Sequence, residues 1–179
     1  MLWRNTPTGF GLITRLLHWT MAALILAQIP LGLKIATMQL GLANLWLFGL
    51  HKTIGFVALI LVLTRLVWHR ISPPPPPLGD ADSLPNRAAR AVHALIYACL
   101  VIIPISGWVA SAATGLEVVI FNQITLPAIA PVSAAWENTG FFIHNSATKL
   151  LMALLVAHIA GAALRAFKGD GTLQRMIKG

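Results

Sequence analysis

The stretch FIHNSATKLLMALLVAHIAG, residues 142–161, carries two histidines in an otherwise mostly apolar run, at positions 144 and 158. In an α-helix, a step of 14 residues returns a side chain to within about 40° of the same face and advances it about 21 Å along the axis. His144 and His158 are therefore expected on one helix face at two separate depths. Because ionisable residues inside apolar spans are costly and usually functional, this spacing indicates two sites stacked along one helix.

This run is one of four that are long enough to cross a membrane, since each crossing needs about 20 mostly apolar residues. The four runs cover approximately residues 12–38, 45–69, 89–113 and 141–167. Only 10% of the residues are charged, against about 25% in soluble domains. Five prolines at 73–77 form a stiff extended linker after the second run. We expect a single all-α domain over residues 1–179, an integral membrane four-helix bundle.

The basic residues indicate the direction of insertion, because short cytoplasmic segments carry an excess of Lys and Arg. They gather around the start of the first run, between the second and third runs, and after the fourth: Arg4, Arg15, Arg70, Arg87, Arg90, Arg165, Lys168, Arg175 and Lys178. The loop between the third and fourth runs has no Lys or Arg. Both termini are therefore expected in the cytoplasm, and this loop in the periplasm of a bacterium. The net charge of +8 lies at the ends of apolar runs and does not indicate nucleic-acid binding.

Two further histidines match the two depths. His18 lies near the cytoplasmic start of the first run, at the depth of His158, and His51 lies near the periplasmic start of the second run, at the depth of His144. A single histidine in a span is more often a packing or proton-relay residue, but two matched pairs suit two b-type haems with bis-histidine ligation. The pairs are too far apart for one zinc site. Cys99, the single cysteine, is expected to be a small packing residue.

Other residues near these histidines have expected roles. Gly55, one turn after His51, leaves room for a macrocycle against the helix. Arg65 is 14 residues after His51 and is expected to act as counter-ion to a haem propionate. His93, at the cytoplasmic start of the third run, could hydrogen-bond a quinone carbonyl, or it could simply anchor the helix at the interface. His69 is expected to lie at the membrane interface.

Short motifs along nearly the whole chain resemble the bacterial cytochrome b561 family of di-haem, four-helix inner-membrane proteins. They are LLHW (16–19), LHKTIG (50–55), TRL (64–66), RAVHALIY (90–97), IPISG (103–107), IHN (143–145), AHIAG (157–161) and GTLQRM (171–176). The resemblance implies that the four paired histidines are axial ligands and that ubiquinone binds. The family commonly has a second pair of histidines after the ligand on the fourth span, where this chain reads ALRAF (163–167). A quinone contact there would have to come from Arg165.

Three lysines lie in the periplasmic half, against the general charge trend: Lys34, Lys52 and Lys149. Bis-histidine ligation leaves no open iron position and favours electron transfer at the haem edge. In the best understood branch of the family, the electron donor is superoxide, an anion that positive charges would steer. The lysines could instead pair with propionates, with Glu117 or with Glu137, or extend to lipid headgroups.

Two functions from different classes are therefore expected. The first is an enzyme that oxidises superoxide at the periplasmic side and reduces ubiquinone. The second is a cytochrome b subunit that relays electrons between a periplasmic redox protein and the quinone pool. A structural membrane subunit without a cofactor is a third alternative, which an absorption spectrum would exclude if it shows haem.

Overall fold

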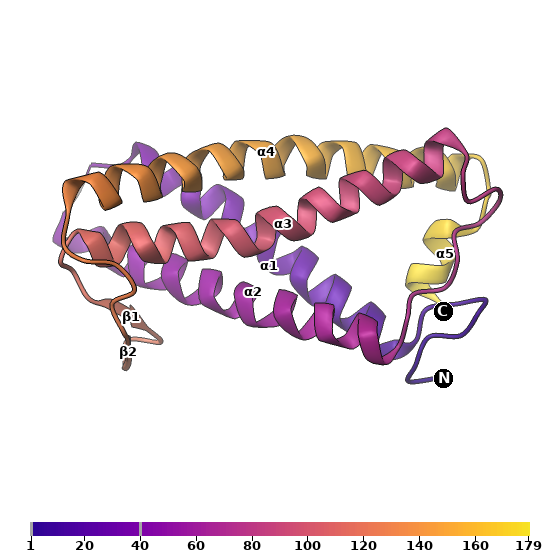
Figure 1. Ribbon diagram of the computed structural model, residues 1–179, viewed down its shortest axis with the longest axis horizontal. Helices are drawn as coiled ribbons and strands as arrows, with labels where there is room; N and C mark the ends of the chain where they lie inside the picture. The colour runs from indigo at the N-terminus through magenta and orange to yellow at the C-terminus, as the bar shows by residue number, and fades with distance from the viewer. Residues whose placement is uncertain (1, 40) are drawn as a thin grey trace.

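Four long helices dominate the computed structural model, which describes residues 2–39 and 41–179 (Figure 1). They are α1 (Leu12–Thr37), α2 (Leu45–Ile71), α3 (Leu84–Ala113) and α4 (Ala134–Phe167). Each is long and apolar enough to cross a membrane. At about 1.5 Å per residue, even the shortest exceeds the roughly 30 Å of hydrocarbon in a bilayer. The predicted all-α membrane bundle is confirmed.

Two helices begin earlier than the apolar runs indicated. Helix α3 begins at Leu84, after Ser83 as N-cap residue and with proline in its first turn, a position that proline favours because its missing N–H has no partner there. Helix α4 begins at Ala134 and carries Glu137 in its first turn, where a carboxylate is favoured by the helix dipole. Hydropathy identifies the part of a helix that is suited to hydrocarbon, so these more polar first turns were missed.

The loop between α3 and α4 contains a small hairpin that the sequence did not predict. Strands β1 (Val118–Ile120) and β2 (Ile124–Leu126) pair antiparallel. At the turn, Phe121 and Asn122 have positive φ angles of 52° and 55°, a conformation uncommon for residues other than glycine. The Phe121 N–H donates to Thr53 Oγ1 on α2 at 2.9 Å, which ties the hairpin to the start of that helix. Two short helices complete the described chain, η1 (Leu42–Asn44) and α5 (Thr172–Ile177).

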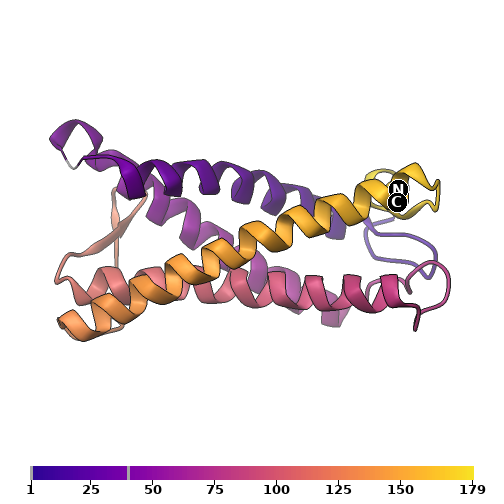
Figure 2. The same ribbon diagram turned by 90° about the horizontal axis from the view of Figure 1, so that it is seen from above.

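The two ends of the bundle are distinct in both views (Figures 1 and 2). The chain termini, α5 and the proline-rich linker lie at one end, which we call the terminal end. The β-hairpin and η1 lie at the other, which we call the hairpin end. Helix α3 packs along α4, α1 packs along α2, and α2 joins the two pairs through α3. Helix α4 has no extensive backbone packing against α1 or α2.

The packed core occupies the middle of the bundle. It consists of Met21, Leu59, Val62, Cys99, Leu100, Leu151 and Leu154. Leu151 is seven residues from His144 and seven from His158, so the core lies between the two histidine depths. Cys99 is a buried packing residue, as expected. Around the outside, large apolar side chains such as Leu26 and Val156 are exposed, as expected for helices that face lipid.

Candidate functional site

Each of the four long helices contributes one residue to each of two levels, because the two residues on every helix are 14 positions apart. The terminal level contains His18, Arg65, His93 and His158. The hairpin level contains Gly32, His51, Gly107 and His144. At about 1.5 Å per residue, the two levels are about 21 Å apart along the helices. The structure thus brings together the same histidine partners that depth matching in the sequence had paired.

At the terminal level, two histidine rings face each other across the bundle. The ring centres of His18 and His158 are 6.2 Å apart. Behind His158, the Nε2 atom of His93 lies 3.2 Å from His158 Nδ1. Behind His18, the Arg65 guanidinium lies 3.2 Å from His18 Nδ1. Both rings are therefore contacted on their Nδ1 atoms, one by a histidine and one by an arginine.

At the hairpin level, the ring centres of His51 and His144 are 6.1 Å apart. His144 Nδ1 lies 2.8 Å from the main-chain oxygen of Ile103 on α3 and so donates its proton there. His51 is held through its main chain, since Gln28 Nε2 on α1 donates to the His51 carbonyl at 2.8 Å. The buried Nδ1 atom of His51 has no hydrogen-bond partner among the described residues.

Glycines on the neighbouring helices make room for the rings of the hairpin level. A Cβ added to Gly107 would lie 2.8 Å from His144 Nδ1, and one added to Gly32 would lie 3.2 Å from His51 Cε1. Gly55, which was expected to leave room for a macrocycle, faces Gln28, where an added Cβ would lie 3.5 Å from the side-chain Nε2. Sequence reasoning missed Gly32 and Gly107. The available signal was their position, 14 residues after His18 and His93.

The spacing of the rings tests whether a metal fits between them. A metal bound to one nitrogen of each imidazole at about 2.0 Å separates the two ring centres by roughly 6 Å, which matches both pairs. A ligating histidine ordinarily donates its other ring N–H to an acceptor, as His144 does to Ile103. The pairs also join α4 to α1 and to α2, helices that do not pack extensively against it. The residues present therefore fit a metal-centred group that would be held by two imidazoles at each level.

Arg65 is a half-buried cation between α2, α1 and α3. Its guanidinium lies 5.6 Å from the centre of the Tyr97 ring and contacts His18, while its buried Nε has no partner among the described residues. The His69 ring packs edge-on against Tyr97, with ring centres 5.8 Å apart. No carboxylate pairs with Arg65 within residues 2–39 and 41–179, where the ion pairs are Arg90–Asp82 and Arg165–Asp170. An anionic group would complete this environment.

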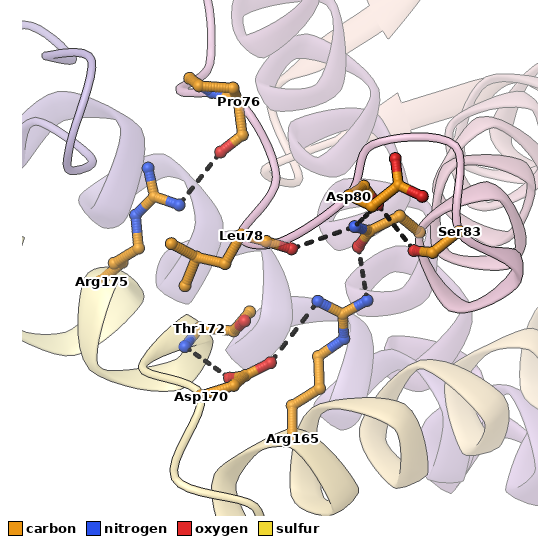
Figure 3. Close-up of polar contacts among 9 residues, drawn as sticks. Pro76, Leu78, Asp80, Ser83, Arg165, Asp170, Thr172 and Arg175 are labelled. Atoms are coloured by element: carbon orange, nitrogen blue, oxygen red, sulfur yellow. Dashed lines mark hydrogen bonds and ion pairs between the residues drawn. The ribbon is translucent and has the colours of Figure 1, made fainter.

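Arg165 is engaged in a network at the terminal end (Figure 3). Its Nη2 donates to Asn86 Oδ1 at 2.7 Å, and its Nη1 is 3.6 Å from Asp170 Oδ2. The amide of Asn86 in turn donates to the main-chain oxygens of Leu78 and Asp80. Both terminal nitrogens of Arg165 therefore tie α4 to the start of α3 and to the segment that leads into α5. The structure does not bring Arg165 into contact with the histidines of the terminal level.

The three lysines occupy different settings. Lys34 is exposed in the last turn of α1, and Lys52 is half-buried beside His51, both toward the hairpin end. Lys149 is exposed on α4, two residues before the core residue Leu151, and so lies in the half of the helix toward the hairpin end, close to its middle. None of them forms an ion pair with a carboxylate among the described residues.

Comparison with known proteins agrees with this architecture. A family model described as "Prokaryotic cytochrome b561" matches residues 9–179. The protein named "Cytochrome b561 homolog 2" of Escherichia coli (strain K12) is 32% identical over 181 residues, which cover 99% of this chain and 95% of that protein. The similarity therefore includes all four long helices and both histidine levels.

Proposed function

The chain belongs to the prokaryotic cytochrome b561 family of multi-pass inner-membrane electron-transfer proteins that bind haem b, and on that premise we propose that it carries electrons from superoxide to ubiquinone. Two superoxide ions would give up one electron each and leave dioxygen. One ubiquinone would take both electrons and two protons and become ubiquinol. The observation that carries the proposal is the presence of two histidine pairs, one on each side of the packed core. The ring centres are 6.2 Å apart in the terminal pair and 6.1 Å apart in the hairpin pair.

In this proposal, each level holds one haem b. His18 and His158 are the ligands at the terminal level, and His51 and His144 are the ligands at the hairpin level. Haem bound at these pairs supplies one-electron chemistry. Gly32 and Gly107 support the assignment because they leave the space that the hairpin-level rings occupy.

Arg65 would serve as the counter-ion of a haem propionate. Arginine only donates hydrogen bonds, so its present contact requires His18 Nδ1 to accept. A neutral histidine that ligates through Nε2 carries its proton on Nδ1 and can no longer accept from Arg65. The guanidinium would then need another acceptor, and a carboxylate is the partner that its planar fork matches best.

Steering of superoxide would fall to the lysines of the hairpin end. A haem held by two histidines would leave no ligand position for the electron donor, which would then react from outside the coordination sphere. Lys34 and Lys52 have no carboxylate partner among the described residues, which leaves their charge available to attract an anion. Lys149 would contribute less, because it lies near mid-height on the exposed side of α4.

The quinone would bind at the terminal end. His93 is exposed on α3 and contacts His158 directly, whereas Arg165 would have to leave Asn86 and Asp170 to reach a ligand. We therefore favour His93 over Arg165 as the quinone contact. The excess of Lys and Arg at the terminal end supports a cytoplasmic location for that end and a periplasmic location for the hairpin end.

A relay function is the second candidate, and one observation favours it. The segment between α3 and α4 exposes several large apolar side chains: Leu116, Phe121, Ile124, Ile129 and Val132. Exposed apolar side chains that gather in one segment are typical of protein or membrane contact surfaces. A periplasmic redox protein could dock there and deliver electrons in place of superoxide.

The test is spectroscopic. The purified protein should contain two b-type haems per chain, and anaerobic addition of superoxide should reduce them and form ubiquinol when ubiquinone is present. Absence of haem would overturn the whole proposal. Two haems that superoxide fails to reduce would overturn the enzymatic function and favour the relay.

A further inference from the structure

We propose that His93 is a positioning residue for His158, accepting a hydrogen bond from its Nδ1–H and lowering the reduction potential of the haem at the terminal level. The inference rests on the proposed haem ligation by His158. It gives His93 a role on the haem side of its ring, which is separate from any quinone contact on its exposed side.

The geometry of the terminal level assigns the two nitrogens of His158. Its ring lies between two other imidazoles, with its centre 6.2 Å from that of His18 and 5.0 Å from that of His93. The nitrogen that approaches His93 is Nδ1, at 3.2 Å from His93 Nε2. Ligation toward His18 therefore uses Nε2, which leaves the proton of the neutral ring on Nδ1. His93 Nε2 must then be the acceptor, and His93 carries its own proton on Nδ1.

The hairpin level repeats this arrangement with different chemistry. His144 also donates from Nδ1 to an acceptor on α3, the carbonyl of Ile103, at 2.8 Å. Helix α3 packs more extensively along α4 than any other pair of helices does. Because α3 is closely packed against α4, it can hold one acceptor beside His144 and another beside His158 at constant distances. At the terminal level that acceptor is a side chain, so mutation can remove it without altering the main chain.

Among the described residues, His93 is the hydrogen-bond partner of His158 Nδ1. Arg65, the other polar residue of the level, contacts His18 and has only donors. An acceptor on the second nitrogen of a ligating histidine makes the ligand more basic and fixes the ring orientation. A more basic ligand stabilises ferric over ferrous iron, so loss of the His93 acceptor should raise the reduction potential of that haem.

The experiment compares His93→Phe, which keeps a flat ring but has no acceptor, with His93→Gln, whose Oε1 can accept. His69→Phe is the matched control, because His69 lies toward the same end but packs against Tyr97 rather than His158. Potentiometric titration of the haem absorbance in quinone-free detergent is the main readout. Electron paramagnetic resonance of the ferric haems reports the ligand orientation independently of turnover.

We expect His93→Phe to change the ferric-to-ferrous ratio of one haem severalfold at a fixed potential, in favour of ferrous iron, and to leave the other haem unchanged. His93→Gln should restore most of the wild-type ratio, and His69→Phe should not alter it. Unchanged reduction potentials and resonance signals in His93→Phe would overturn the inference. This holds even if the KM for ubiquinone rises in that variant. If His93→Phe loses one haem, retention of that haem by His93→Gln supports the inference and its loss there overturns it. A wild-type protein without two haems would instead contradict the proposed function.

Discussion

The two histidine levels have the same pair of imidazoles but different neighbours. At the hairpin level, α1 and α3 contribute Gly32 and Gly107, and His144 donates a hydrogen bond to a main-chain carbonyl. At the terminal level, α2 and α3 contribute Arg65 and His93, whose side chains contact the rings of His18 and His158. The hairpin level thus depends on space, and the terminal level depends on charge and hydrogen bonding. The same 14-residue step on each helix can therefore create two similar sites whose surroundings differ.

The largest effect is expected from removal of a ligand. Replacing His51 or His144 with Ala should remove about half of the haem, since a second axial ligand is needed at each iron in this type of site. Replacing His18 or His158 should remove the other half. Haem and protein are quantified in parallel, and the pairing is wrong if any single replacement leaves both haems bound or removes both.

A substitution at Gly107 tests whether the hairpin level depends on space. Gly107→Ala places a Cβ 2.8 Å from His144 Nδ1 and should displace the ring from the Ile103 carbonyl. We expect weaker binding of the hairpin-level haem, by about tenfold or more, as for other losses of a ligand's hydrogen-bond partner. Gly161→Ala is the control, because an added Cβ there meets nothing within 4 Å. Equal haem affinity in the two variants would contradict this interpretation.

A substitution at Arg65 tests whether the terminal level depends on charge. Arg65→Gln keeps hydrogen-bond donors but removes the cation, so it should weaken the terminal-level haem and leave the hairpin-level haem unchanged. An effect of roughly 1.5–3 kcal/mol is the usual range for a hydrogen bond to a charged group. Transfer of haem to added apo-globin measures how tightly each level binds its haem. Equal weakening at both levels would show that Arg65 acts on the fold as a whole.

The smallest effect is expected at Lys52, which concerns the approach of the electron donor. Lys52→Glu should slow haem reduction by superoxide, and more so at low salt than at high salt, because charges are screened beyond about 10 Å at 0.1 M. Lys168→Glu is the control at the opposite end of the bundle. Stopped-flow absorbance measures the rate of haem reduction in each variant and in the wild type. If the difference between Lys52→Glu and the wild type does not depend on salt, Lys52 has no steering role.

The sequence predicted most of the site because the main signals are local to each helix. Hydropathy identified the four spans, and the 14-residue step placed His144, His158 and Arg65 at the correct depths. It missed the hairpin at 118–126, whose turn donates a hydrogen bond to Thr53, a residue far away in the sequence on α2. It also did not identify Gly32 and Gly107, which lie beside the rings of His51 and His144, because it considered only glycines on the same helix as each histidine.

The amino-acid sequence alone indicated that four helices cross a membrane and that their histidines lie at two depths. Both properties follow from apolar length and from the constant rise and rotation of an α-helix. The contacts between helices became visible in the folded chain: His93 with His158, Gly107 with His144, and Arg165 with Asn86 rather than with the terminal level. Such contacts depend on how each helix is rotated and crossed against its neighbours, and packing between residues far apart in the sequence sets that rotation.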